Sequence, residues 1–426
     1  ETSMTPAVLQ QIVAEAEKAL DGNQPWVAVA LYTDILAQTD PQSDFPENKE
    51  LRLTALFERG RILHELGENE AALLAYEQYL FEAPDARHRS RAIEATGTTL
   101  RQMGRFQEAR EKYEESLKLA EKVMYPYGRA KALYGLGTYH HLMGHEDEAQ
   151  KYLQMAYMLY KSSGSITGQI ETLILMGLMQ SYNQIDKSIT TYNEALHLAR
   201  NQGAIRDLVT ILNNLGECYQ DLFDMEQALA IHQEALLLAL QAQLRPIQAD
   251  LYRNIGVDLT FLEKFVTAQE NLQQALQISR EVEDADVEAQ VLYSLAITEV
   301  KQDHLESAQQ YADLLLDLAS RKESDRYRAR AYYALGLTKQ QQEDPIAAAE
   351  QWQQALFLAH QTHQQMLLWQ IHASLAEISA IPGLGAVHLR IAAEIIQQIA
   401  QPIKDEALRQ KFLTSPYVAR VISKAR

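Results

Sequence analysis

The sequence has little of several features that would place it in a common protein class. It has one cysteine, Cys218, in 426 residues, so neither a disulfide framework nor a site of four thiolates can form within one chain. No stretch approaches eighteen consecutive apolar residues, and the first residues lack a basic segment followed by an apolar one. Neither a membrane span nor a secretory signal is therefore expected. We expect a reducing, cytoplasmic location and no membrane partner.

Basic residues are also scarce relative to acidic ones. The 39 lysines and arginines face 57 aspartates and glutamates, which gives a formal net charge of −18. Proteins that bind nucleic acids generally gain most of their affinity from neutralised phosphates. The charge balance therefore predicts that this chain binds no nucleic acid directly.

Catalytic motifs are missing as well. The sequence has no phosphate-binding G-x-x-x-x-G-K-[ST] loop, no H-E-x-x-H pair and no G-x-S-x-G elbow. His140 and His141 could be taken as a metal-binding pair, but adjacent residues on a helix point about 100° apart. A surface or packing role is the favoured interpretation. We expect no enzyme activity, no cofactor and no metal site.

What the sequence does contain is a block that returns about every forty residues. Each block has a small residue within an apolar helical pattern, followed twelve residues later by Ala and by a second apolar helical pattern. The small residues lie 37, 40, 40, 39, 40, 40, 40 and 40 residues apart. They are Gly60, Gly97, Gly137, Gly177, Gly216, Gly256, Ala296, Gly336 and Ala376.

The block predicts a helical hairpin. A small residue on the first helix should face the Ala of the second helix and let the two backbones approach. One copy departs from the rule, since Ser188 follows Gly177 after eleven residues, so we expect a local irregularity near Asp186. One hairpin cannot cover its own apolar stripe, whereas stacked hairpins can, and this predicts a single elongated all-α array without an internal boundary.

This pattern resembles the tetratricopeptide repeat in a forty-residue form. The resemblance implies an all-α, right-handed superhelical solenoid of about ten helix-turn-helix repeats with a C-terminal capping helix. The array should span residues 5–400, and the closing segment, 402–426, resembles the end of repeat arrays in bacterial multidomain regulators, with Phe412, Leu413 and Val418 sealing the last hairpin. The expected repeats are 5–40, 47–84, 86–122, 126–163, 166–202, 205–242, 245–282, 285–322, 325–362 and 365–400.

In such arrays the first helix of each repeat lines the inner groove, and this locates the candidate binding residues. The N-terminal repeats carry a basic set that suggests a pocket for carboxylate or phosphate groups, with an ordinary charged face as the alternative. The resemblance implies that Asn214 and Asn254 bind the main chain of a peptide, or else hydrogen-bond to a neighbouring repeat. The tyrosines could form a ligand pocket or part of the core between repeats. The candidates are Arg61, Arg91, Arg101, Lys131, Tyr134, Asn213, Asn214, Glu217, Arg253, Asn254, Tyr293 and Tyr333.

These observations predict a non-enzymatic scaffold or sensor that binds an extended peptide or protein segment in its inner groove. Two alternatives stay open. The chain could be a repeat arm of a bacterial signal-transduction regulator that senses a small molecule or inhibits its own protein. It could also be a scaffold that associates with itself.

Overall fold

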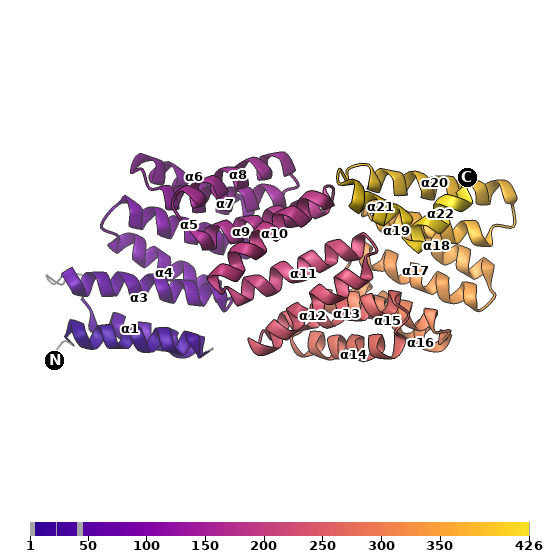
Figure 1. Ribbon diagram of the computed structural model, residues 1–426. Coiled ribbons are helices and arrows are strands. Elements are labelled where there is room, and N and C mark those ends of the chain that lie inside the picture. The colour runs from indigo at the N-terminus through magenta and orange to yellow at the C-terminus, as the bar shows by residue number, and fades with distance from the viewer. Residues whose placement is uncertain (1–4, 23, 41–45, 426) are drawn as a thin grey trace. The chain divides into compact units, whose positions relative to one another are not determined.

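The computed structural model describes residues 5–22, 24–40 and 46–425, and all their regular secondary structure is helical (Figure 1). Ten consecutive hairpins and two shorter terminal helices account for it, which confirms the predicted all-α repeat fold. The first five hairpins comprise α1 (Pro6–Asp21), α2 (Pro25–Gln38), α3 (Pro46–Glu65), α4 (Asn69–Glu82), α5 (Ala86–Gln102), α6 (Phe106–Lys122), α7 (Pro126–Leu142), α8 (Glu146–Ser162), α9 (Ile166–Ser181) and α10 (Ile185–Gln202).

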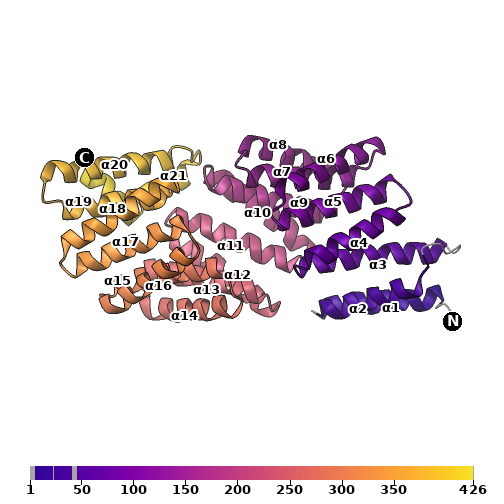
Figure 2. The same cartoon turned by 180° about the vertical axis from the view of Figure 1, so that it is seen from behind.

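The remaining helices follow in chain order (Figure 2). They are α11 (Ile205–Asp221), α12 (Met225–Gln241), α13 (Arg245–Phe261), α14 (Phe265–Glu281), α15 (Ala285–Lys301), α16 (Leu305–Arg321), α17 (Asp325–Gln341), α18 (Pro345–Gln361), α19 (Gln365–Ile378), α20 (Pro382–Ala400), α21 (Glu406–Thr414) and α22 (Pro416–Ala425).

Contacts within the chain group these helices into two compact units, although the sequence predicts a single array. The first unit ends at Leu175 and the second begins at Met176, so the division falls inside α9. The repeat spacing continues through this division, but the division falls in the hairpin whose spacing between Gly177 and Ser188 is one residue short.

Each glycine of the repeat makes room for a large side chain of the second helix. A Cβ atom added to Gly256 would lie 2.5 Å from Cγ of Leu272, and one added to Gly336 would lie 2.3 Å from Nε1 of Trp352. The glycine faces the Ala twelve positions on, as expected, since the added Cβ at Gly256 would lie 3.2 Å from the carbonyl oxygen of Ala268; its closest neighbour, however, is the side chain sixteen positions on. Where the first position is Ala296, the residue sixteen positions on is Ala312, and both belong to one buried cluster. A larger residue at the first position is thus accompanied by a smaller one at the second.

The turns repeat as regularly as the helices. A residue with positive φ occurs every twenty residues from Gly104 to Gly164 and again from Gly203 to His363. The turn between α9 and α10, whose residues are all described, has none, and there the N–H of Gln184 donates to the carbonyl oxygen of Gln180, 2.7 Å away and four residues back. In the regular turns this bond reaches five residues back. The turn before Asp186 is therefore irregular, as its missing residue predicts.

The first helices of successive repeats pack against one another. In the second unit α11 contacts α13, α13 contacts α15, α15 contacts α17 and α17 contacts α19. The second helices α12, α14, α16 and α18 show no comparable contacts with one another among the described residues. Helices that lie closer together form the inner side of a curved stack. We call the side of α11, α13, α15 and α17 that faces away from their second helices the inner face.

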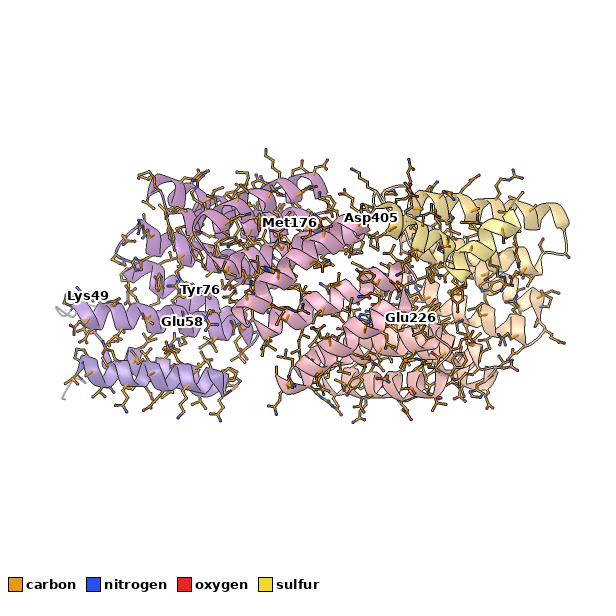
Figure 3. The ribbon with its side chains drawn as sticks, viewed as in Figure 1. Lys49, Glu58, Tyr76, Met176, Glu226 and Asp405 are labelled. Carbon is orange, nitrogen blue, oxygen red and sulfur yellow. The ribbon has the colours of Figure 1, made fainter. Side chains whose placement is uncertain are left out.

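The C-terminal segment, residues 404–425, does more than seal the last hairpin. It consists of two helices rather than one, because the first helix ends before Ser415 and a second begins at Pro416. Both helices pack on α20. Phe412 and Val418 are fully buried, as expected, whereas Leu413 is only partly buried. The main-chain N–H groups of Lys404 and Asp405 donate to the carboxylate of Asp186, at 2.9 and 3.2 Å (Figure 3 labels Asp405).

An aromatic cluster continues this bridge between the segment and earlier repeats. The ring of Phe223, in the turn after α11, lies 6.3 Å from that of Phe412 and 5.8 Å from that of Tyr417. Tyr417 also lies 5.1 Å from Phe261, and its hydroxyl accepts a hydrogen bond of 3.0 Å from Nζ of Lys301. The segment therefore connects the first repeats of the second unit to the last hairpin.

Candidate functional site

A polar ladder crosses the inner face between α11 and α13. The Nδ2 group of Asn254 donates to Oδ1 of Asn213, at 3.0 Å, and to Oε1 of Glu217, at 3.1 Å. Arg253 donates from Nη2 to the same Oε1 atom, at 3.1 Å, and lies 3.7 Å from Asp250. Asn254 is fully buried, whereas the side chain of Glu217 is 43% exposed. The ladder thus holds one carboxylate at the surface, beside a largely buried guanidinium, by means of a buried amide.

A second group of polar side chains supports the ladder from behind. His232 Nδ1 lies 2.7 Å from Oδ2 of Asp258, and His232 Nε2 donates to the carbonyl oxygen of Asn213, at 3.3 Å. Gln220 donates from Nε2 both to Oδ1 of Asp258, at 2.7 Å, and to the carbonyl oxygen of Asn254, at 3.1 Å. A carbonyl oxygen can only accept, so the bond to Asn213 requires a hydrogen on Nε2 of His232, while Nδ1 faces the Asp258 carboxyl.

Burial determines the properties of this inner pair. Both His232 and Asp258 are fully buried, and burial raises the pKa of the Asp258 carboxyl, while hydrogen bonds from His232 and Gln220 oppose the rise. Space for the imidazole comes from Gly216, since a Cβ atom there would lie 2.3 Å from Nε2 of His232. The glycine of this repeat therefore admits a polar ring where Leu272 or Trp352 stands in other repeats.

The two asparagines expected to bind a peptide main chain lie in different surroundings. Asn254 has no exposed surface, and its Nδ2 group is occupied by Asn213 and Glu217. Its expected role as a direct ligand contact is therefore wrong, and it corresponds to the alternative of a bond between repeats. Asn214 is partly exposed on α11, one position beyond the ladder, and its role stays a prediction.

The three candidate tyrosines also differ. Tyr293 is partly buried, burial raises the pKa of its hydroxyl to about 12, and the guanidinium of Arg330 lies 5.5 Å from the centre of its ring. Tyr333 is almost fully buried, which favours its alternative role in the core between repeats. Tyr134 belongs to the first unit, where burial raises its pKa to about 12.

The N-terminal basic set lies in the first unit, and its members have acidic or aromatic neighbours. Arg61 pairs with Glu58, at 2.8 Å, and with Glu65, at 2.5 Å. Arg91 lies 3.5 Å above the ring of Phe57 and 3.4 Å from Glu58, which Figure 3 labels. This arrangement corresponds to the alternative of an ordinary charged face, because the guanidinium groups already have partners within the chain.

The other two basic candidates of the first unit are more enclosed. The carboxylate of Glu94 is the main cause of a raised pKa at Lys131, and burial opposes it. The Nε atom of Arg101 is buried and has no hydrogen-bond partner. Lys131 is close enough to Arg91 for the charge of Arg91 to lower its pKa, and Glu94 supplies the opposing negative charge.

Metal ligation receives no support from the described part of the chain. Within it, no group of three or more His, Cys, Asp or Glu side chains could hold a metal ion. His140 instead stacks on Tyr152, with ring centres 5.3 Å apart and planes 12° apart.

No helix among the described residues is both long and apolar enough to cross a membrane.

Sequence reasoning missed the residues behind the ladder. The corresponding residues, forty positions on, are different. They are Thr260, Leu272 and Thr298, which take the places of Gln220, His232 and Asp258. A comparison of the repeats position by position would have singled out His232 and Asp258, because a buried imidazole and a buried carboxylate are costly unless they are paired.

Comparison with known proteins gives this fold a family. The family model described as the tetratricopeptide repeat matches residues 91–162, 207–281 and 247–321. No curated protein sequence matches the chain. Among solved structures, the apo form of the quorum sensor NprR from B. thuringiensis is similar with a TM-score of 0.60 at 17% identity, over 82% of this chain and 99% of that chain.

Two further structures have the same architecture. A Rap protein complexed with competence and sporulation factor matches with a TM-score of 0.55 at 13% identity, over 84% of this chain and 99% of that chain. The signal-transduction ATPase with numerous domains and a tetratricopeptide-repeat sensor from Pyrococcus horikoshii matches at 0.58 and 13%, over 82% of this chain and 54% of that chain. At these identities the likeness is one of fold. The matched repeats are similar to the tetratricopeptide repeat, and the hairpins on either side of them form the same kind of helical solenoid.

Proposed function

We propose that the chain is a non-enzymatic binding protein that takes an extended peptide segment against the inner face of its second unit. The observation that carries the proposal is the polar ladder, which presents the partly exposed Glu217 and Arg253 from a buried amide scaffold. A fixed carboxylate beside a fixed guanidinium can accept from and donate to successive peptide groups of an extended chain.

The structural neighbours add support of a general kind. One is a Rap protein complexed with competence and sporulation factor, and another is a Rap conjugation regulator in complex with the Phr* peptide. NprR is a quorum sensor, and the signal-transduction ATPase from Pyrococcus horikoshii has a tetratricopeptide-repeat sensor. A role as the repeat arm of a signalling protein is consistent with the same inner-face binding.

The surface hollows give less support to a small-molecule site. One hollow of about 490 Å³ is lined mainly by charged side chains of α5 and α6, such as Glu111, Glu114 and Lys118. Another of about 690 Å³ lies at the turns before α15 and α17, with Glu283, Asp284 and Asp286 among its lining. Small-molecule sites are usually concave and mostly apolar.

The test is affinity selection from a synthetic library of random nonapeptides on the immobilised chain, with bound peptides identified by mass spectrometry. Wild type should retain a related set of sequences, and Glu217→Ala/Arg253→Ala should retain far fewer. The matched control is Arg200→Ala/Glu234→Ala, which removes an ion pair of 2.7 Å between α10 and α12, helices outside the inner face. Retention of the same peptides by both variants would contradict the inner face as the binding surface.

A further inference from the structure

The C-terminal segment, residues 404–425, joins the rest of the second unit at two unlike junctions. At the first junction α21 and α22 pack on α20, and Arg420 and Lys424 both pair with Glu377 of α19, at 2.9 and 3.1 Å. At the second junction the segment reaches the earlier repeats of the unit, but neither of its helices shows comparable packing on α11, α13 or α15 in the described part of the chain. The segment therefore belongs to the last hairpin and only touches the earlier repeats.

Charged groups make one half of the second junction. The carboxylate of Asp186, at the start of α10, accepts from the main-chain N–H groups of Lys404 and Asp405, at 2.9 and 3.2 Å. Asp224, in the turn after α11, accepts from Nζ of Lys411. The side chain of Lys411 is 50% exposed, so water and salt reach this ion pair. Ion pairs that water reaches contribute little to stability and are screened by salt.

One aromatic side chain makes the other half of the second junction. The ring of Tyr417 lies beside those of Phe223 and Phe261, with ring centres 5.8 and 5.1 Å away. Nζ of Lys301 donates to the Tyr417 hydroxyl, at 3.0 Å, and lies 4.9 Å from the centre of its ring. Tyr417 and both phenylalanines are only partly buried. These neighbours therefore hold Tyr417 without enclosing it.

The charge of the segment is complementary to that of the chain on which it docks. The segment has five lysines and arginines and two acidic residues, whereas the whole chain has a net charge of −18. Opposite charges attract the segment to the acidic repeats. Since helix packing does not add to this attraction at the second junction, the contact there has the properties of a reversible one.

The second junction also acts on the shape of the repeat stack. Each repeat of a solenoid contacts mainly the next one, so its curvature follows from small rotations that add up along the stack. The second junction instead joins α10 and the turn after α11 to the last hairpin, and the helices from α13 to α18 lie between them in the chain. While this junction is made, the rotations of those repeats are no longer independent.

We propose that the C-terminal segment is a releasable clasp on the second unit. In the closed form, which the structure shows, the clasp fixes the curvature of the inner face. In the released form the segment stays on α20, and the repeats from α11 to α18 turn more freely relative to one another. A ligand that prefers one curvature shifts this equilibrium, whatever its chemistry. The proposal therefore does not depend on the peptide proposed above.

Hydrogen exchange of the full chain tests the clasp, measured by mass spectrometry with fragmentation that resolves single residues. The main-chain N–H groups of Lys404 and Asp405 are the reporters, because the hydrogen bonds they make are those to Asp186. The N–H groups of Gln410 and Phe412, inside α21, report unfolding of the segment itself. Release should expose the reporters and leave the N–H groups of α21 protected.

Two variants weaken the second junction away from the reporters. Asp224→Asn removes the charge that binds Lys411 but keeps an oxygen to cap α12. Lys301→Met removes the donor to Tyr417. Each should speed exchange of the reporters about 10-fold, the factor expected for one charge-assisted hydrogen bond. The matched control Lys424→Gln removes an ion pair with α19 at the first junction and should leave the reporters unchanged.

A distance measurement shows whether release changes the curvature. Spin labels at Glu226→Cys and Arg390→Cys would lie on α12 and α20 at exposed positions, whereas the native Cys218 is buried. The labelled chain should give one population of distances by double electron–electron resonance. Asp224→Asn/Lys301→Met should add a second population, and so should sodium chloride at about 1 M, where the screening length is about 3 Å.

The proposal fails in three distinguishable ways. If both single variants leave exchange of the reporters at the wild-type rate, the segment is a fixed part of the fold. If exchange of Gln410 and Phe412 rises by the same factor as that of the reporters, the segment unfolds instead of being released. If the reporters exchange faster but the double variant keeps the wild-type distance, the junction does not control the curvature.

Discussion

The small residue of each first helix and the side chain sixteen positions on are expected to compensate each other in size. A double-mutant cycle at Gly256 and Leu272 tests this expectation. An added Cβ at position 256 would lie 2.5 Å from Cγ and 2.7 Å from Cδ2 of Leu272, closer than side-chain carbons approach. Overpacking of this kind costs about 1–3 kcal/mol, against which the better helix propensity of Ala returns about 1 kcal/mol. Leu272→Ala alone should cost about 2–5 kcal/mol because it leaves a cavity.

The double variant Gly256→Ala/Leu272→Ala copies the pair Ala296 and Ala312 of the next repeat. It should be more stable than the sum of the single effects by about 1–3 kcal/mol, because the added methyl group fills part of the cavity. Opening of α13 and α14 would be followed by hydrogen exchange with mass spectrometry, which reports local stability in a repeat array.

Gly383→Ala is the control for this cycle, since no heavy atom lies within 4 Å of a Cβ atom added there. It should be neutral or slightly stabilising. The reasoning would be refuted if Gly256→Ala were as stable as the control variant, or if the effects at positions 256 and 272 were additive.

Three further outcomes are expected. Phe412→Ala should lower the free energy of unfolding by about 3–5 kcal/mol, because the ring of Phe412 is fully buried. Phe357→Ala should change it by less than about 0.5 kcal/mol, since Phe357 is 61% exposed. Urea denaturation of the two variants measures both effects. Burial and the neighbouring His388 hold the pKa of His372 at about 4, below its unfolded value of about 6.5, so the unfolded chain binds the proton first as pH falls. Stability should therefore fall between about pH 6.5 and pH 4, and His372→Gln should flatten this dependence in urea titrations at a series of pH values. Burial raises the pKa of the Cys218 thiol to about 12, so a thiol reagent should react with it in urea but hardly in the native chain.

Much of the fold could be predicted because its information is local. The spacing of small and apolar residues sets each hairpin, so the expected repeat 285–322 corresponds to α15 and α16, Ala285–Arg321. The missing residue before Asp186 likewise predicts an irregular turn. In contrast, the contacts of Asp186 with Lys404 and of Asp224 with Lys411 join residues 218 and 187 positions apart. Such contacts leave no periodic signal in the sequence.

The candidate site could be predicted only in outline. The sequence places Asn213, Glu217, Arg253 and Asn254 on the first helices of neighbouring repeats, and the structure joins their side chains. The repeat pattern does not tell a buried amide from an exposed one, because Asn214 and Asn254 hold the same place in successive repeats. The difference arises from their partners, which belong to other helices.

The same limit applies to charge. A count of basic residues singles out Arg61 and Arg91 but cannot show that Glu58 and Glu65 already neutralise them. Whether an arginine is available to a ligand depends on side chains from at least two helices, and only the structure brings these together.

Packing alone does not account for the polar group behind the ladder. The place of His232 is taken by Leu272 in the next repeat and by Trp352 three repeats after His232, so an apolar side chain can also fill it. A buried imidazole and carboxylate are costly to desolvate and are tolerated only when every polar atom has a partner. Here Asp258 is bound by His232 and by Gln220, and Gln220 also binds the backbone of α13 beside Arg253. The consequence is a rigid connection between α11, α12 and α13 at the one place where Glu217 and Arg253 reach the inner face. Stability does not require that connection, whereas a binding surface with fixed polar groups does.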